Sequence, residues 1–284
     1  MNTQQTTPLK CKDFSVSGEE FELVLNQEYG YLETLPQPTK ENLLRYYESE
    51  NYISHTNTKR NLFEKLYHTI RCISLKRKLN LINSFPFEEK KILDIGCGTG
   101  AFLKTALDNG WESYGIEPNN KARAIANKAC KGFVFNTNKL ESFKTESFDV
   151  ITLWHVLEHL PNLKVQIATL KRILKQNGTL VIAVPNYHSF DAKHYQNYWA
   201  AYDVPRHLWH FSRESISKLF GKADMRVEKT LPMLFDAFYV SLLSEKYKNK
   251  SMNPFRAFYI GLRSNLKAKR SKEYSSIIYV IKKN

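Results

Sequence analysis

The fold of this chain is decided by nine residues, Ile92-Leu-Asp-Ile-Gly-Cys-Gly-Thr-Gly100. An apolar run ends in an aspartate and is followed by glycines at three alternate positions. This pattern predicts a buried parallel strand that enters a tight turn and then a helix. Glycine is favoured where the backbone approaches a ligand closely or adopts a positive φ. The stretch therefore indicates a loop that binds a nucleotide-containing cofactor.

Two classes of cofactor compete for this loop. With Ala101 included, the glycines also fit the G-x-G-x-x-G/A fingerprint of dinucleotide binding. Glu117 ends the next predicted strand, and its carboxylate can accept from both hydroxyls of a ribose in either class. Asp94 separates the two, because it would repel a nicotinamide pyrophosphate and attract a cationic ammonium. A nicotinamide oxidoreductase is therefore the weaker alternative.

Several motifs, which follow one another in the same order along the chain, resemble those of the class I S-adenosylmethionine-dependent methyltransferases. The loop Leu93–Gly100 is similar to the first motif of this family, Gly115-Ile-Glu-Pro118 to its second, and Ser147–Leu160 to its fourth-strand motif. The resemblance implies that S-adenosylmethionine contacts Asp94, Gly96, Cys97, Gly98, Thr99, Gly100, Glu117, Pro118, Asn138, Leu140 and Trp154. Asn138, or the backbone near Leu140, replaces the aspartate that often holds the adenine amine in the family.

Strands and helices alternate from Lys90 to about residue 190. Alternation of this kind predicts an α/β fold with a Rossmann-like, seven-stranded, mostly parallel sheet and helices on both faces. Five strands are expected near 91–95, 112–117, 133–136, 148–154 and 178–184, and a final pair near 225–231 and 275–281. Asn177-Gly178 is expected to form the turn before the fifth strand.

The chain divides into five predicted parts. Residues 1–38 read as an N-terminal extension with short strands, and 39–89 as a helical lid on which Tyr46, Tyr47 and Tyr52 are candidates for ligand contacts. The cofactor-binding core is expected over 90–233, a basic and aromatic helical insert over 234–273, and the last core strand over 274–284. Within the core, the aromatic segment Asn186–Trp209 is expected to form a binding wall, and Ser212 to cap the following helix.

Methyl transfer to a hydroxyl or amine needs a general base, and histidine suits that role near neutral pH. The candidates are His155, His159 and His207, with His210 as a further alternative. His155-Val-Leu-Glu-His159 also matches the H-x-x-E-H pattern of a metalloprotease group, but it follows a strand inside a methyltransferase-like pattern. Quinone and small-RNA methyltransferases carry a similar Glu-x-x-Glu-His that binds magnesium; here His155 replaces the first glutamate, and no metal is included in the expected site.

Charge and apolar patterning bear on partners and location. The chain has 42 Lys and Arg against 28 Asp and Glu, a formal net charge of +14, which favours an anionic partner. The insert has apolar stretches flanked by basic residues, for which packing on the sheet is favoured over contact with an anionic membrane surface. The polar start and the absence of a long apolar run predict a cytoplasmic protein, with peripheral membrane association as an alternative.

The sequence thus predicts an S-adenosylmethionine-dependent methyltransferase that acts on an oxygen of a small or lipid-linked molecule. An RNA methyltransferase is the first alternative, favoured by the positive charge but lacking a recognisable RNA-binding module. A non-catalytic, cofactor-binding regulatory protein is the second, because no catalytic base is fixed by the sequence.

Overall fold

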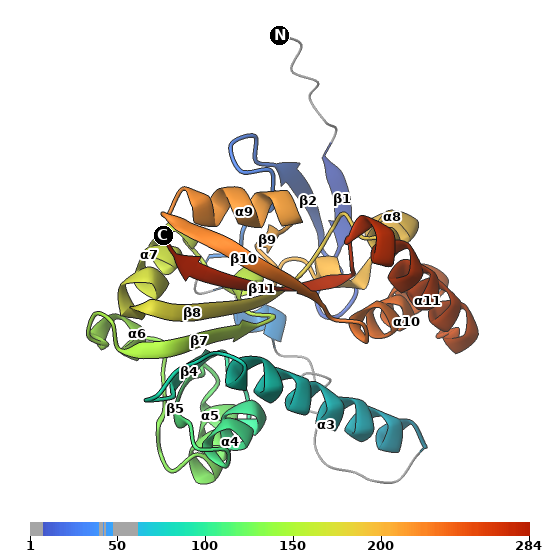
Figure 1. Cartoon of the computed structure of the whole chain (residues 1–284). Coiled ribbons are helices and arrows are strands. Elements are labelled where there is room, and N and C mark those ends of the chain that lie inside the picture. The colour runs from blue at the N-terminus through green and yellow to red at the C-terminus, as the bar shows by residue number, and fades with distance from the viewer. Residues whose placement is uncertain (1–7, 40–41, 43, 48–61) are drawn as a thin grey trace.

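A seven-stranded sheet forms the centre of the molecule in the computed structural model, which describes residues 8–39, 42, 44–47 and 62–284 (Figure 1). The strand order is β10-β11-β8-β7-β4-β5-β6, and only β11 runs antiparallel to its neighbours. The strands are β4 (Lys91–Ile95), β5 (Glu112–Ile116), β6 (Val134–Phe135), β7 (Phe148–Trp154), β8 (Leu174–Pro185), β10 (Met225–Pro232) and β11 (Ser276–Lys283). The predicted fold class is confirmed.

Helices cover both faces of this sheet (Figure 1). The α-helices from Leu62 onward, not all of which lie on a face of the sheet, are α3 (Leu62–Asn83), α4 (Ala101–Leu107), α5 (Asn120–Ala129), α6 (Lys139–Ser142), α7 (Leu163–Ile173), α8 (Phe190–Tyr195), α9 (Arg213–Gly221), α10 (Asp236–Asn249) and α11 (Pro254–Ser271). Successive residues of a strand point to opposite faces. Accordingly, Ile92 packs with α3 and α4, whereas Leu93 packs in the larger core with α7 and α9. The predicted cap is confirmed, since Ser212 accepts the Ser215 N–H at the start of α9.

The predicted turn at Asn177-Gly178 is wrong. Both residues lie inside the continuous strand β8. The register between β7 and β8 shifts between Phe148 and Val150, whose partners are Leu174 and Thr179. Between these two pairs β8 has more residues than β7, and the extra residues form an irregularity within the paired strand. The dipeptide Asn177-Gly178 alone does not reveal this arrangement.

A second, antiparallel sheet is built mainly from the N-terminal part of the chain. Its order is β1 (Leu9–Lys12), β2 (Glu20–Leu25), β3 (Leu32–Leu35) and β9 (Trp209–His210). β9 comes from the middle of the chain and pairs with β3 through Leu32 and Glu33. This pairing joins the N-terminal residues to the segment that follows the fifth parallel strand.

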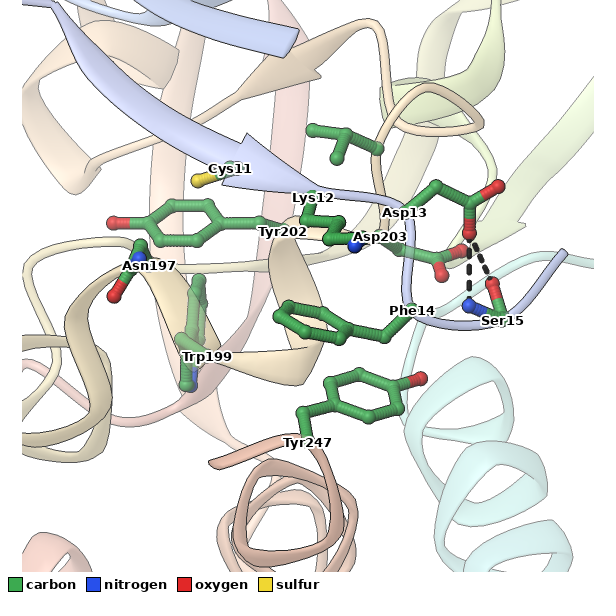
Figure 2. Close-up of a pocket in the computed structure, with 11 residues that line it drawn as sticks. Cys11, Lys12, Asp13, Phe14, Ser15, Asn197, Trp199, Tyr202, Asp203 and Tyr247 are labelled. Atoms are coloured by element: carbon green, nitrogen blue, oxygen red, sulfur yellow. Dashed lines mark hydrogen bonds between the residues drawn. The ribbon is translucent and has the colours of Figure 1, made fainter. Parts of the chain in front are cut away.

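The prediction that residues 186–209 form an aromatic binding wall is wrong for the largest side chains of this segment. Tyr195, Trp199 and Tyr202 are buried in a second hydrophobic core under the N-terminal sheet. Figure 2 shows Trp199 and Tyr202 facing the end of β1, where Phe14 stacks on Tyr247 with ring centroids 4.8 Å apart. The space left there is about 10 Å³, room for about one water molecule. These aromatic residues therefore form a core rather than a ligand surface.

The region expected to form the lid is described only in part. A 3₁₀ turn spans Leu44–Tyr47, and α3 follows from Leu62. Tyr52 lies outside the described residues, as do residues 40–41, 43 and 48–61 of the predicted lid. Within the described ranges, none of the helices has the length and apolar character needed to cross a bilayer.

The insert before β11 is a pair of adjacent helices, α10 and α11, at the edge of the sheet beside α8 (Figure 1). The two helices approach closely at Gly261, where an added Cβ would lie 2.8 Å from the Phe238 ring and 3.0 Å from the Ala237 carbonyl oxygen. The buried face of α11 is made mostly of small side chains, namely Ala257, Ile260, Gly261, Ser264 and Ala268. Its large apolar residues therefore point elsewhere.

Candidate active site

The glycine loop lies at the carboxyl end of β4, where open parallel sheets bind their ligands. Gly96, Gly98 and Gly100 all have positive φ, of 70°, 55° and 79°. At Gly96 a Cβ would lie 2.4 Å from Cγ2 of Val156, so the position has no room for a side chain. α4 begins directly after Gly100. The loop thus places exposed backbone and the N-terminus of a helix at one place, which suits a bound nucleoside.

Glu117 is held against this loop from the end of β5. Its Oε2 accepts the Gly98 N–H at 2.8 Å, and its Oε1 accepts the Asn119 N–H at 2.9 Å. Each carboxylate oxygen has a second lone-pair direction, so the group retains capacity for two hydroxyl donors. The side chain is fixed and nearly buried, and it fits the ribose hydroxyls of S-adenosylmethionine.

Asp94, at the end of β4, is also buried. Its Oδ1 accepts the hydroxyl of Thr152 at 2.6 Å. Burial raises the pKa of Asp94 to about 7, although the Thr152 hydrogen bond and the charge of Lys78 act to lower it. Burial deprives the ionised carboxylate of hydration and so destabilises it. A nearby positive charge compensates for that loss, so a buried carboxylate favours a cationic partner. This environment fits the ammonium of the cofactor's methionine part.

The other expected cofactor contacts are distributed around the same edge. Cys97 is partly buried in the loop, and Thr99 and Pro118 are exposed beside it. Asn138 is exposed after β6, and Leu140 is buried in α6. Asn138 makes no side-chain hydrogen bond to the start of α6, so its amide is available to an adenine amine.

Trp154 ends β7 next to Lys78 of α3, which is not among the residues expected at the site. The Lys78 ammonium lies 4.2 Å from the centroid of the Trp154 ring. Burial lowers the pKa of Lys78, and the charges of Asp94 and Asp236 oppose that shift. The buried Trp154 indole nitrogen has no hydrogen-bond partner among the described residues. Buried polar atoms without a partner are rare in folded proteins, and a bound ligand is one way to satisfy this nitrogen.

A cavity of about 310 Å³ lies between α3 and the chain segment that links β10 to α10. Its wall is mainly apolar, and Lys78, Arg77 and Asp236 supply its charged groups. Volumes and linings of this kind are typical of small-molecule sites. Lys78 connects this cavity with the expected cofactor site, because it lines the cavity and its charge also interacts with that of Asp94.

His155 is poorly suited to the predicted role of general base. Its Nε2 lies 3.0 Å from Oδ2 of Asp236, and its Nδ1 lies 3.4 Å from Oε1 of Glu158. Burial alone would lower the pKa of His155, but the two carboxylates outweigh it and raise the pKa to about 10. The imidazole is therefore protonated at neutral pH and has no lone pair for a substrate proton.

His159 and His207 are brought together by the fold, with ring centroids 4.5 Å apart. His159 Nδ1 donates to the Arg206 carbonyl oxygen at 3.0 Å, and His207 Nδ1 to the Ala201 carbonyl oxygen at 2.9 Å. In the neutral form of either ring, Nε2 is then the nitrogen that can bind a metal ion. Burial and the neighbouring His207 lower the pKa of His159 to about 4. Glu158 is fully buried beside them, and neither of its carboxylate oxygens has a hydrogen-bond partner among the described residues.

These three residues form a donor set that could hold a metal ion. One ligand atom from each of Glu158, His159 and His207 lies within 4.8 Å of the others. Imidazoles whose second nitrogen donates to a backbone carbonyl are the usual form of histidine ligands. A carboxylate with two imidazoles suits a first-row transition-metal cation such as Zn²⁺. His210 lies apart from the set, with its Nε2 3.0 Å from the Thr34 hydroxyl.

Residues of the N-terminal part of the chain hold the backbone next to the Glu158, His159 and His207 cluster in place. Thr34 donates its hydroxyl to the His207 carbonyl oxygen at 2.6 Å, and its N–H to the Leu208 carbonyl oxygen at 3.0 Å. The buried Arg206 donates to the carbonyl oxygen of Tyr46 at 2.9 Å and pairs with Asp203 and Ser15. The positions of His159 and His207 thus depend on contacts from residues near the N-terminus.

Two site residues were missed by the sequence analysis, Lys78 and Asp236. The sequence pattern could have indicated Lys78, because this residue shares a helix face with Leu75, Leu79 and Ile82, which pack in the core. Asp236 is a single acid within an otherwise apolar stretch of the insert. An ionisable side chain at a position that the pattern assigns to the core is a reason to suspect function.

Comparison with known proteins agrees with this geometry. The model of the family described as a methyltransferase domain matches residues 66–230, more than half of the chain. The chain belongs to the methyltransferase-domain family. The family expected from the sequence motifs is therefore confirmed, and S-adenosylmethionine is the cofactor expected of it. The matched residues include the glycine loop, Glu117 and the Glu158 cluster of this methyltransferase-family chain.

Individual relatives match shorter stretches. The chain is 33% identical over 108 residues to a ubiquinone biosynthesis O-methyltransferase of Glaesserella parasuis serovar 5 (strain SH0165), which covers 34% of this chain and 46% of that protein. It is 32% identical over 97 residues to a demethylmenaquinone methyltransferase of Tropheryma whipplei (strain Twist), which covers 33% and 41%. The chain thus spans about half the length of the curated relatives it matches.

A solved structure shows the same fold. The magnesium protoporphyrin IX methyltransferase of Synechocystis PCC 6803, crystallised with bound SAH, aligns with a TM-score of 0.56 at 12% identity. The alignment covers 86% of this methyltransferase-family chain and 100% of that protein. At this identity the similarity establishes the arrangement of the sheet and its helices.

Proposed function

We propose that this methyltransferase-family protein transfers the methyl group of S-adenosylmethionine to an oxygen atom of a small, largely apolar acceptor. The observation that carries the proposal is the position of Lys78, which lines an apolar cavity and whose charge interacts with that of Asp94 at the end of β4. Lys78 thus links the proposed acceptor cavity to the carboxylate that precedes the glycine loop. The named functions of the matched relatives, which act in ubiquinone and menaquinone biosynthesis, are consistent with such an acceptor.

Each group of the proposed cofactor site has one task. The glycine loop receives the methionine part, Asp94 attracts its ammonium, and Glu117 accepts from the ribose hydroxyls. Asn138, or the backbone near Leu140, receives the adenine amine. Bound in this way, S-adenosylmethionine supplies an electrophilic methyl group on its sulfonium. What remains for the protein is to hold the acceptor oxygen in line with that methyl group.

Lys78 is proposed to act on the acceptor. An acceptor hydroxyl would give its proton to bulk water as its oxygen forms the bond to the methyl carbon, and the electron pair of the broken sulfur–carbon bond would remain on the sulfur. The Lys78 ammonium, half-buried beside an apolar wall, stabilises the resulting oxyanion more than it would in water. The ion pair with His155 fixes Asp236, the acidic group of the cavity. The cavity volume of about 310 Å³ favours a single small molecule over the RNA alternative.

We also propose that Glu158, His159 and His207 hold a divalent metal ion, in place of the base role expected for the two histidines. The support is the buried carboxylate without hydrogen-bond partners among the described residues, and the two imidazoles already oriented by backbone carbonyls. The protonated His155, with its Nδ1 3.4 Å from Glu158 Oε1, already offsets part of the negative charge of Glu158, and a metal ion would bind the carboxylate directly. This differs from the sequence-based expectation, which included no metal.

Ligand-induced thermal stabilisation tests the cofactor assignment. S-adenosylmethionine and S-adenosylhomocysteine, but not NAD, should raise the melting temperature, with about 2.7 kcal/mol of stabilisation at a hundredfold excess over Kd. Glu117→Gln should lose the shift, whereas Glu112→Gln, at an exposed acid of the same strand, should retain it. Stabilisation without turnover on any phenol, quinol or RNA acceptor would favour the non-catalytic alternative. The absence of stabilisation by either sulfur compound would overturn the proposal.

A further inference from the structure

The outer face of α11 carries an exposed apolar stripe. Five large residues recur at the spacing of one helix face, i, i+3, i+4, i+7 and i+11. Their side chains are exposed by 87% at Phe255, 59% at Phe258, 57% at Tyr259, 40% at Leu262 and 53% at Leu266. A surface helix of a globular protein normally turns such a face inward, so this stripe requires an explanation.

The opposite face of α11 already packs on the protein. Ala257, Gly261 and Ser264 are buried there, and Gly261 lies against α10. α11 also contacts α8 on that side. The stripe therefore cannot turn inward without breaking this packing, and its exposure is a property of the folded chain.

Basic residues flank the stripe. α11 contains Arg256, Arg263, Lys267, Lys269 and Arg270 and has no acidic residue. Arg256 pairs with Glu245, while Arg263, Lys267 and Arg270 surround a shallow hollow next to Leu266. On a helical projection, Arg263, Lys267 and Arg270 lie along one border of the stripe. The face thus combines apolar and aromatic side chains with a positively charged edge.

We propose that α11 is an interfacial helix that docks this protein on an anionic lipid surface. Phe255, Phe258 and Leu262 would enter the boundary between headgroups and acyl chains, with Tyr259 near the headgroups. The cations at the edge would attract anionic headgroups. A second copy of the chain fits less well, because two such faces would bring only positive charges together. The proposal reverses the sequence-based preference for packing of the insert on the sheet.

The docking helix is connected to the cavity. Asn265 of α11 donates its side-chain N–H to the carbonyl oxygen of Leu234, which lines the cavity, at 2.8 Å. A docked α11 would hold that wall close to the lipid. Docking itself does not depend on the acceptor, so the lipid test would stand if the proposed reaction proved wrong.

Sedimentation with vesicles tests the proposal on the full chain. We expect binding to phosphatidylglycerol–phosphatidylcholine vesicles, little binding to phosphatidylcholine alone, and a steep decrease with salt. Phe255→Ser with Phe258→Ser should reduce the anionic-vesicle affinity by about tenfold or more. The matched control is Val165→Ser with Ile125→Ser, which removes exposed apolar side chains from α7 and α5 and should leave binding unchanged.

Charge is tested separately. Lys267→Gln with Arg270→Gln should reduce binding by about tenfold or more, since each basic residue near a lipid surface contributes to attraction. Lys121→Gln with Lys128→Gln removes the same charge from exposed positions of α5 and should have little effect. Melting temperatures of all variants establish that they fold. No binding to anionic vesicles, equal binding by the stripe variant, or sedimentation equilibrium showing that the stripe joins two copies would each overturn the proposal.

Discussion

The hydroxyl of Thr152 donates a 2.6 Å hydrogen bond to Oδ1 of Asp94, and the two residues are direct partners on the neighbouring strands β7 and β4. Thr152 is fully buried. A residue of one strand thereby favours the ionised form of the carboxylate on the next strand, against the effect of burial. Because burial raises the pKa of Asp94 to about 7, a modest change in its surroundings alters its charge near neutral pH.

Cofactor affinity should depend on pH through Asp94. Below about pH 7 the carboxyl is protonated and loses its attraction for an ammonium, so Kd for S-adenosylmethionine should fall by up to about tenfold as pH rises from about 6 to about 8. Lys78 lowers and Glu117 raises the pKa of Asp94, so both affect the midpoint. Isothermal titration across this range measures it. A pH dependence that persists in Asp94→Asn would assign it to another group.

Thr152→Val should move that midpoint to higher pH. The substitution keeps the shape of the side chain but removes the donor that favours the ionised carboxylate, so the pKa of Asp94 rises. In the free protein, the folded state already binds the Asp94 proton more tightly than the unfolded state. The contribution of Asp94 to stability therefore declines as pH rises from about 4 to about 7. An unchanged midpoint in Thr152→Val would show that the hydrogen bond has no influence.

Gly96→Ala should destabilise the protein and weaken cofactor binding. The added Cβ would lie 2.4 Å from Cγ2 of Val156 at a residue with φ of 70°, for an expected loss of about 2–4 kcal/mol. Gly110→Ala is the matched control, because Gly110 has φ of 85° but no atom near the added Cβ, and it should cost about 1 kcal/mol. Denaturant unfolding of the two variants measures the difference. Equal losses would mean that only the backbone conformation matters.

Lys78→Met should lower kcat by roughly 100-fold while changing the Kd of the cofactor little. Methionine keeps the apolar stem against Trp154 and removes the charge that would stabilise the acceptor oxyanion. Lys76→Met changes an exposed lysine of the same helix and should retain activity. Initial rates on a phenolic acceptor, together with cofactor titrations, separate the two effects. A variant with normal kcat would exclude the proposed role of Lys78.

Metal binding should depend on Glu158. The protein incubated with Zn²⁺ or Mn²⁺ and then desalted should retain about one equivalent, and Glu158→Gln should weaken the affinity by at least about tenfold. His188→Gln, outside the cluster, serves as the control. Elemental analysis and calorimetric titration give stoichiometry and Kd. Equal metal content in wild type and Glu158→Gln would place the metal elsewhere or exclude it.

The parts of the molecule that could be predicted from the sequence are those that a local residue pattern determines: the buried strands, the glycine loop and a helix cap. Strand segments such as Leu180–Val184 of β8 are continuous apolar runs because they are buried on both faces, and the glycine loop is fixed by backbone conformations that few other residues adopt. For the same reason, Ser212 was identified as a cap from its position before a helix.

Features that depend on long-range packing were not predictable in this way. Composition cannot distinguish an aromatic residue in a second core, such as Trp199, from one that lines a site. Asn177-Gly178 has the sequence of a turn, but its pairing with β7 holds it in a strand. Lys78 and Asp236 come from distant segments, and only the folded chain shows that they share a cavity.

The bonds from Thr34 and Arg206 have a practical consequence for shortened versions of this protein. Residues 66–230 include all the groups proposed to contact cofactor or metal, and a fragment with those ends would look self-sufficient. It would nevertheless leave the buried Arg206 guanidinium without Ser15 and Tyr46, and the His207 backbone without Thr34. Trimming the N-terminus would therefore remove the scaffold of the histidine pair, and inactivity of such a fragment would say nothing about the chemistry of the whole chain.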